Sequence, residues 1–475
     1  MARKLESAGI RGAGAEARPP ARPDVREPLR AAARERAEPL ARGALSPSGC
    51  ASPPAVRAAG GRPAPGVSEP GAPPDRLAAL KRLPLSRLAP PAKAIGGVAG
   101  AKLYALAVLS ILFLRIPVRY GDKGFVYRPA GQSMEERMAA VEANFFERLA
   151  PYDGQWYLDI AERGYRRLSK VETRSGRLPP GNYAFFPLLP ALTRGARAAF
   201  GSAGLAVAVL TAGTLSALGA LVVWMLARRL DQNPILPLAL VLAFPTAVFQ
   251  LVLYTEGPFL FLSALALLGA LERRTALVAA AGALAGLTRP QGALLALPVF
   301  VELVLPSILG RERLSGARVL GRLAAALAPF SGVIVLAAVS ASLTGSPGAF
   351  LSVQSHWGRS LGALGFLEGL RSVLEYGGPR ADLFGLAFAL ALLPALWRRL
   401  PFSLALYGTA LVALPLSTGS LLSFGRFVSV SIPHFLALGR LLERAPAAVR
   451  GGMVGAFAVG QVLVASGLVA WYLVG

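Results

Sequence analysis

Cysteine and histidine are nearly absent from this sequence, and their scarcity excludes several kinds of site. Cys50 is the single cysteine, so the chain can form neither an internal disulfide nor a thiolate metal site. His356 and His434 are the only histidines, which argues against a zinc site built from imidazoles. No apolar run precedes Cys50, so cleavage of a signal peptide in front of it is not expected.

Charged residues are also scarce. They make up 16% of the 475 residues, whereas a soluble domain carries about a quarter. Hydrophobic residues make up 54%, and many of them form long runs, so the sequence predicts a polytopic membrane protein. The formal charge is +24, but much of it lies in an N-terminal tail and in short joints between apolar runs. Because these residues form no folded basic face, nucleic-acid binding is not expected.

Residues 1–92 have a composition that disfavours folding. They are rich in alanine, arginine, proline and glycine and have almost no aromatic residues. Such a segment buries too little apolar surface to offset its ordering entropy, so we expect a disordered, basic cytoplasmic tail. Its charge would hold it against anionic lipid. A start codon placed too early in the gene is an equal alternative, and neither interpretation gives the tail any chemistry.

Residues 93–475 are expected to form an all-α polytopic membrane domain with about eleven transmembrane helices. With the basic joints inside, the first span delivers residues 119–183 to the outer face as a loop of roughly sixty residues, far longer than usual connections. Several runs are shorter than the roughly 20 residues of a straight crossing, which favours some re-entrant half-spans. The expected spans are 94–118, 205–227, 234–253, 258–271, 275–287, 293–305, 323–343, 383–396, 402–416, 427–438 and 453–473.

The stretch 145–190 within and after this loop mixes carboxylates, aromatic residues and arginines. Trp156, Ile160 and Gly164 recur at helical spacing, which predicts a short helix lying on the membrane surface. The solvated side of this helix is expected to carry Asp159, Glu162 and Arg163.

The topology drawn from the arginine joints brings five other polar residues to the same outer side. They are Asp153, Glu256, Arg289, His356 and Arg426. Carboxylates and lone arginines converging at one membrane face are typical of a functional site. No tight metal cluster is visible, although Asp153 and Glu256 would be able to share a divalent ion if they met.

Each of these residues also has a purely structural interpretation. Asp153 is suited to cap a helix, and Glu256 to complement the dipole at a helix start. Arg289 and Arg426 have the length to reach lipid headgroups. His356–Trp357 fits an anchor at the membrane interface better than a site.

Several short motifs together resemble the PIG-V family of mannosyltransferases, of the GT-C type. Eukaryotic members of that family add the second mannose of glycosylphosphatidylinositol anchors, and this chain is expected to be similar to the less defined bacterial members. The resemblance covers residue 95 to the C-terminus. It departs from the family pattern where Pro151-Tyr152 replaces the usual tryptophan, often preceded by arginine, and where the insertion between Tyr165 and Asn182 is basic. The motifs are Tyr152-Asp153-Gly154 with Trp156-Tyr157, Ile160 to Tyr165, Asn182 to Pro187 with Pro190, Phe244-Pro245, Tyr254-Thr255-Glu256, Leu287 to Gly292, and Gly425-Arg426-Phe427 with Pro433.

The resemblance implies transfer of mannose or a similar hexose from a polyprenyl-phosphate donor to a hydroxyl of a lipid or glycan at the outer face, with inversion. It implies that Asp153 is the catalytic base, and it matches the substrate-binding candidates Trp156, Tyr157, Tyr254, Glu256, Arg289 and Arg426. The three aromatic residues are expected to line the sugar-binding site, and Glu256 to orient the hydroxyl groups. The two arginines are expected to stabilise the leaving phosphate. The sequence separately favours a lipid-borne donor, because it offers neither a soluble segment long enough for a nucleotide-sugar domain nor a glycine-rich phosphate loop.

Two other functional classes fit the sequence less well. A transporter or lipid flippase would place polar residues near the membrane midplane on broken helices, often in repeated halves, whereas the candidates here lie at helix ends and no repeat is visible. A non-catalytic membrane subunit that scaffolds a partner is the third class, and activity of the purified chain would exclude it.

Overall fold

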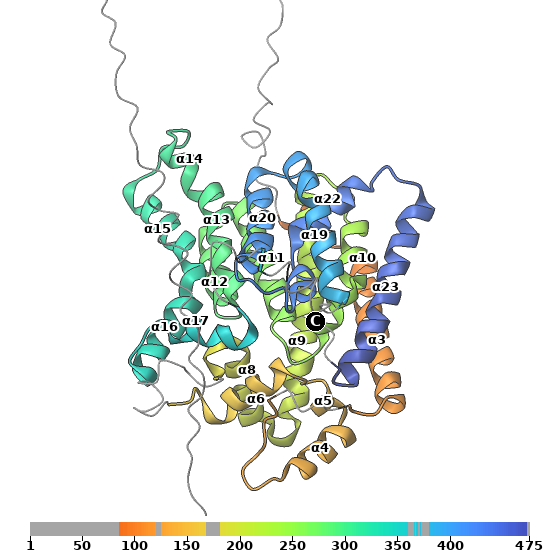
Figure 1. The fold of residues 1–475 in the computed structure, drawn as a ribbon. Helices are drawn as coiled ribbons and strands as arrows, with labels where there is room; N and C mark the ends of the chain where they lie inside the picture. Colours follow the sequence, from red (N-terminus) through yellow and green to blue (C-terminus); the bar gives the residue numbers. More distant parts are fainter. Residues whose placement is uncertain are drawn as a thin grey trace, which may run out of the picture. The chain divides into compact units, whose positions relative to one another are not determined.

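The computed structural model describes residues 85–119, 125–167, 181–359, 365, 367–368, 371 and 380–472. Every regular element in these ranges is a helix, as expected (Figure 1). Most of the expected disordered tail, residues 1–84, lies outside the described residues. At its end the expectation was wrong: α2 (Leu85–Leu88) is helical and Leu88 is 1% exposed, packed in the largest core cluster.

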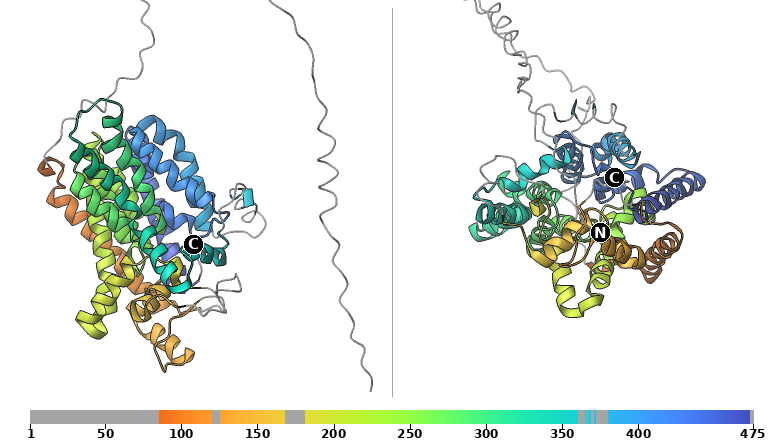
Figure 2. Two further views of the ribbon diagram at one scale, coloured as in Figure 1. Left: turned by 90° about the vertical axis from the view of Figure 1, so that its left-hand side faces the viewer. Right: turned by 60° about the horizontal axis from the view of Figure 1, so that its bottom comes forward.

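The expected outer loop is folded in its described parts. Its elements gather at one end of the helical bundle, opposite α14 and α15 (Figures 1 and 2). They are α4 (Met134–Ala143), α5 (Phe145–Arg148), α6 (Asp153–Arg163) and the 3-10 turn η1 (Asn182–Ala184). The α6 helix confirms that this stretch is helical, and most of its residues are packed within the protein.

The remaining helices follow the order of the predicted apolar runs. They are α3 (Ala92–Arg115), α8 (Leu188–Phe200), η2 (Gly201–Ala203), α9 (Gly204–Arg229), α10 (Ile235–Ala243), η3 (Pro245–Leu251), α11 (Glu256–Leu271), α12 (Thr275–Gly286), η4 (Pro290–Leu295), α13 (Ala296–Val299), η5 (Phe300–Val304), α14 (Leu305–Ile308), α15 (Gly316–Leu327), η6 (Ala328–Phe330), α16 (Ser331–Thr344), α17 (Ala349–Ser352), η7 (Val353–Trp357), α19 (Arg380–Arg399), α20 (Phe402–Leu416), α21 (Phe424–Val428), α22 (Ile432–Leu441) and α23 (Ala447–Val469).

Six helices among the described residues are long and apolar enough to cross a membrane, and a bent pair raises the number to seven. They are Ala92–Arg115, Leu188–Arg229, Pro290–Ile308, Gly316–Thr344, Arg380–Arg399 and Ala447–Val469. The expected number of about eleven is therefore not confirmed. The reason lies in the short runs: α12 has 12 residues and α20 has 15, which is less than the roughly 20 residues that a straight crossing needs.

The bent pair consists of η3 and α11, which meet at 97° across a short break. Glu256 is the first residue of α11 and stands at this break, fully buried. Around it, the largest core cluster joins side chains of α9, α10, α11, α19, α20 and α22. The bend therefore directs a carboxylate into the protein, where only another polar group can compensate for its desolvation.

Helices α9 and α11 approach closely because α9 has glycine at the contact. A Cβ atom added at Gly219 would lie 2.8 Å from the Phe261 backbone nitrogen and 2.9 Å from Leu260 Cγ. We expect Gly219→Ala to lower the free energy of unfolding by about 1–3 kcal/mol, the usual cost of overpacking. Unfolding of the purified protein in detergent measures it.

Gly213 provides the matched control on the same helix. A Cβ there would meet Leu251 Cδ2 at 3.6 Å, an ordinary contact. Because alanine favours a helix interior over glycine, Gly213→Ala is expected to be neutral or slightly stabilising. Equal losses in both variants would show that the close approach of α9 and α11 is not the cause.

Hydrogen bonds connect the end of α23 to the segment that leads into α6. The Arg119 backbone N–H donates to Ala470 O at 2.7 Å, and the Trp471 indole N–H donates to Arg148 O at 3.0 Å. The Tyr152 hydroxyl donates to Trp471 O. These contacts link the first and last membrane helices to the start of α6, and so fix the position of Asp153.

Candidate functional site

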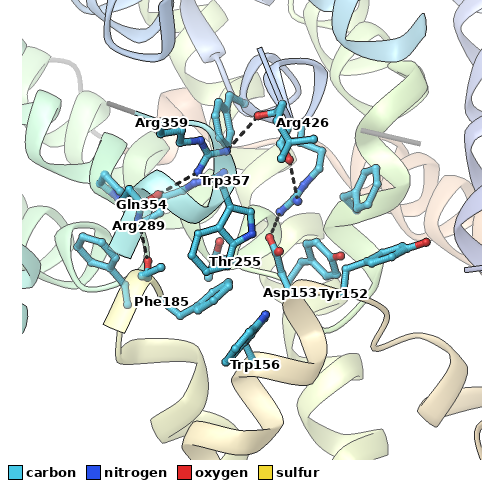
Figure 3. Close-up of a pocket in the computed structure, with 18 of the residues that line it drawn as sticks. Tyr152, Asp153, Trp156, Phe185, Thr255, Arg289, Gln354, Trp357, Arg359 and Arg426 are labelled. Carbon is cyan, nitrogen blue, oxygen red and sulfur yellow. Dashed lines mark hydrogen bonds and ion pairs between the residues drawn. The ribbon is translucent and has the colours of Figure 1, made fainter. Parts of the chain in front are cut away.

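Asp153 is the first residue of α6, and the backbone in front of it is strained. Tyr152 has φ 43° and ψ −102°, a conformation that residues other than glycine rarely adopt. Such strain is characteristic of functional sites. The cap position of α6 is Tyr152, whose side chain makes no capping hydrogen bond, and Asp153 is already inside the helix. Asp153 Oδ2 instead accepts from Arg426 Nη2 at 2.8 Å, with 26% of the side chain exposed (Figure 3). The capping interpretation of Asp153 was wrong.

Arg426 joins two carboxylates inside the protein. Besides Asp153, it contacts Glu256 Oε1 through Nε at 3.0 Å and through Nη2 at 2.9 Å. Its guanidinium lies over the rings of Tyr254 at 4.4 Å and Phe249 at 5.0 Å. Arg426 is 4% exposed and Glu256 is fully buried, so Arg426 does not reach outward to headgroups. Sequence positions 153, 256 and 426 thus form one ion cluster.

Arg289 lies at the edge of this cluster. Its Nη1 is 3.4 Å from Glu256 Oε1, and its Nε donates to Gln291 Oε1 at 3.2 Å. Its guanidinium is 5.1 Å from the centre of the Phe427 ring. Because the side chain is only 6% exposed, Arg289 is buried beside the ion cluster and does not extend outward as a headgroup anchor would.

Arg359 is a further cation that sequence reasoning missed. It donates to Gln354 Oε1 at 3.3 Å and to Leu422 O at 3.0 Å, and it lies 5.4 Å from the Phe427 ring (Figure 3). Among the described residues it has no carboxylate within ion-pair distance. Burial lowers the pKa of Arg359 to about 10, so the side chain is still charged at neutral pH. Arg289 and Arg359 therefore both lie against Phe427 at the cavity; Arg289 has only the 3.4 Å contact with Glu256, and Arg359 has no carboxylate partner among the described residues.

Asp382 was also missed, and it holds the turn that carries Arg426. Its Oδ2 accepts from the Ser423 N–H at 2.9 Å and its Oδ1 from the Gly425 N–H at 2.8 Å. Ser423 has a φ of 68°, so the turn adopts a left-handed conformation that these bonds stabilise. A single acid directly before the predicted span 383–396 was the signal that could have identified it.

A cavity of about 3060 Å³ is bordered by Asp153, Arg289, Arg359 and Arg426. Its polar part is lined by arginines and by the carboxylates of Asp153 and Asp159; its apolar part runs between α19, α20 and α23. Of the predicted site residues, all but Glu256 line it, and Glu256 lies behind Arg426. The apolar lining includes Phe384, Leu414, Pro415, Phe457, Gly460 and Leu463.

The aromatic candidates have different surroundings. Trp156 is stacked between Phe125 at 3.8 Å and Phe185 at 5.6 Å, and Trp357 meets it edge-on at 6.3 Å. Both faces of the Trp156 ring therefore have aromatic neighbours. Tyr157 is 4% exposed and Tyr254 is 1% exposed. The Tyr254 ring packs against the Arg426 guanidinium. Trp357, expected to anchor the chain at the membrane interface, lines the cavity.

Asp159 is not on the solvated face that the sequence predicted, whereas Glu162 is. Asp159 lines the cavity, its side chain is 14% exposed, and it accepts from Asn182 Nδ2 at 3.0 Å. Glu162 is 37% exposed and pairs with Arg197. The prediction for Asp159 was wrong because η1, which is distant in sequence, folds back over this side of α6.

Burial raises the pKa of Asp159, and the Asn182 hydrogen bond and Arg163 only partly offset this. A pKa raised in the folded state means that the ionised carboxylate is the less well accommodated form. Below about pH 4 the group is neutral in both states; as pH rises past the folded pKa, the native protein loses stability. We expect Asp159→Asn, which keeps an acceptor for Asn182, to gain stability relative to the parent between pH 4 and pH 7. Thermal unfolding at both pH values tests this, and parallel pH dependence of the two proteins would contradict it.

A divalent ion shared by Asp153 and Glu256 is disfavoured by charge. The two carboxylates do converge, but Arg426 Nη2 lies within 2.8 Å of one and 2.9 Å of the other. Among the described residues no group of three or more histidine, cysteine, aspartate or glutamate side chains is placed to hold a metal. The cluster therefore neutralises its carboxylates with a guanidinium.

The chain was compared with known proteins in three ways. No protein-family model matches it, no curated protein matches it, and no solved structure matches it.

Proposed function

We propose that this protein is a membrane glycosyltransferase. It transfers mannose or a similar hexose from a polyprenyl-phosphate donor to a hydroxyl of a lipid or glycan acceptor. The observation that carries the proposal is the position of the Asp153 carboxylate. It lies at the wall of a large cavity and forms an ion pair with the buried Arg426. The motif resemblance supplies the sugar and the donor class.

The reaction is a single displacement. The Asp153 carboxylate takes the proton of the acceptor hydroxyl, whose oxygen attacks the anomeric carbon. A new carbon–oxygen bond forms as the bond from that carbon to the phosphate oxygen breaks. The polyprenyl phosphate leaves with both bonding electrons, and the anomeric configuration is inverted. The hydrogen bond from Arg426 leaves the second oxygen of Asp153 available for this proton.

The phosphate is assigned to Arg289 and Arg359. Arg426 already contacts two carboxylates, so its charge is largely neutralised before any substrate binds. Arg289 and Arg359 lie on Phe427 at the cavity surface and have free capacity to donate to phosphate oxygens. Arg426 and Glu256 then act by holding Asp153 in place, which differs from the phosphate-binding and hydroxyl-orienting roles expected from sequence.

The apolar part of the cavity suits the hydrocarbon chain of the donor. It runs from the arginines to α23, where Leu463 is 67% exposed. Phe384 and Phe457 meet edge-on at 5.9 Å on its lining. A hydrocarbon chain in this part of the cavity extends laterally into the bilayer. The donor can therefore enter the site from the membrane, without crossing a water-filled channel.

The candidate site is assigned to the outer face of a multi-pass cell-membrane protein with a cytoplasmic N-terminus. α9 has 26 residues, so its last arginines lie about 39 Å from its start beside α8. Arginines gather at that far end, as the positive-inside rule requires of the cytoplasmic side. They include Arg228, Arg229, Arg273, Arg322 and Arg440. About eleven crossings fit this orientation if the short helices pair into spans.

Transfer by the purified chain tests the proposal. The protein is reconstituted in vesicles with radiolabelled polyprenyl-phosphate mannose and a bacterial lipid extract as acceptor. We expect label in a new glycolipid and none when a nucleotide-linked mannose replaces the donor. Movement of the intact donor between leaflets without a new glycosidic bond would favour the flippase alternative and contradict the proposal.

A further inference from the structure

A second, smaller pocket of about 460 Å³ lies at the far end of the molecule, by the N-terminal parts of α12 and α15. α12 has 12 residues and ends just before Thr288 and Arg289, so about 18 Å of helix separates this pocket from the candidate active site. Its lining includes Arg273, Thr275, Glu312, Arg318, Gly321 and Arg322. Three arginines face a single carboxylate, so the pocket is positively charged.

Two of these arginines are held in fixed positions. Arg322 contacts Glu312 with both terminal nitrogens, at 2.8 and 3.0 Å, and donates to Leu303 O at 3.0 Å. Arg273 donates to Glu312 Oε2 at 2.7 Å. Each guanidinium has further N–H donors. Glu312 thus orients two guanidinium groups without neutralising both, a preorganised arrangement for a phosphate group.

One face of α15 is shaped to admit a ligand. Arg318, Gly321 and Arg322 follow the i, i+3, i+4 spacing of one helix face. A Cβ atom at Gly321 would meet no atom within 4 Å, so the space above it is open. Arg318 is exposed and therefore able to close over a bound anion.

Aliphatic side chains also lie at this basic pocket. Leu314 is part of its lining, and Ile308 and Leu309, shortly before Glu312 in the chain, are 63% and 53% exposed. Positive charge beside exposed aliphatic side chains is the arrangement of a membrane interface, where headgroups meet acyl chains. A ligand that satisfies both surfaces carries a phosphate and hydrocarbon chains.

We propose that this pocket binds the phosphate headgroup of an anionic phospholipid. Arg273, Arg318 and Arg322 contact the phosphate, and the acyl chains lie beside Leu314 and the exposed Ile308 and Leu309. The site is independent of the proposed sugar transfer, since it involves none of the same residues.

Binding of phosphatidylglycerol to the full-length, delipidated protein tests the proposal. A fluorescent phosphatidylglycerol is titrated in neutral detergent micelles, with phosphatidylcholine as the neutral comparison. We expect Arg318→Gln to weaken phosphatidylglycerol binding at least fivefold. Gly321→Leu, which fills the pocket without changing charge, is expected to do the same.

Two matched variants separate this pocket from general attraction. Arg398→Gln removes an exposed arginine from the C-terminal end of α19, and Gly316→Leu changes a glycine of α15 whose Cβ position is also open. Both are expected to bind within twofold of the parent. The proposal is overturned if Arg318→Gln and Gly321→Leu bind normally, if Arg398→Gln loses as much, or if free glycerol phosphate competes as well as the lipid.

Discussion

Asp153→Asn is expected to lower the rate of sugar transfer by about 10²–10⁴-fold, the usual contribution of a positioned general base. Asparagine has almost the same shape and still offers an oxygen to Arg426 Nη2, which now lies 2.8 Å from Asp153 Oδ2. The variant loses the proton acceptor and keeps the packing. The measurement is transfer from labelled polyprenyl-phosphate mannose by equal amounts of inserted protein.

The control for this experiment lies on the same helix. Glu162 is 37% exposed and pairs with Arg197 on the outside of α6. Glu162→Gln also removes one carboxylate from this helix, and we expect it to transfer sugar at close to the parental rate. Near-parental turnover by Asp153→Asn would remove Asp153 from the catalytic role, and Asp159, the other carboxylate on the cavity wall, would take its place as the candidate.

Arg426→Leu is expected to lower the free energy of unfolding by about 3–5 kcal/mol, because it leaves a buried charge without its partner. Glu256 is fully buried, its Oε2 has no hydrogen-bond partner among the described residues, and Arg289 is 3.4 Å from its Oε1. Once Arg426 is removed, that longer contact alone must compensate for the desolvated carboxylate. Denaturation of the purified protein in detergent measures the loss.

A double variant identifies the cause. Arg426→Leu combined with Glu256→Leu removes both charges, and we expect it to recover most of the stability lost in the single variant. Arg197→Leu breaks the partly exposed pair with Glu162 and is expected to cost at most about 1 kcal/mol. A double variant as unstable as Arg426→Leu would show that packing of the arginine, and not charge, maintains this region.

The apolar runs and their order could be predicted from sequence, because helix formation and lipid exposure depend on local composition. The same holds for the existence of α6, which the helical spacing of Trp156, Ile160 and Gly164 predicted; its solvated side was predicted only in part, because Asp159 lines the cavity. The number of crossings was harder to obtain. Length decides whether a helix spans, and breaks such as the 97° bend between η3 and α11 depend on packing.

The members of the ion cluster could be named from sequence, but their partners could not. Residues 153, 256 and 426 are far apart in the chain, and nothing local says that one guanidinium contacts both carboxylates. Asp382 was missed because it lies at the edge of the predicted span 383–396, where a charged residue ordinarily signals a helix end. Arg359 was missed because it lies inside the loop between the predicted spans 323–343 and 383–396, where a charged residue is ordinary. Asp159 was misplaced because its burial comes from Asn182, across the long loop.

The hydrogen bonds between the end of α23 and the start of α6 also have a consequence for the order of synthesis. Tyr152 and Trp471 are 319 residues apart, so a ribosome that has translated Asp153 needs roughly 15–60 s more before their contact is possible. Until α23 enters the membrane, the strained turn at Tyr152 lacks the hydroxyl contact that fixes it. The carboxylate of Asp153 is therefore set in its final position only when membrane insertion is nearly complete.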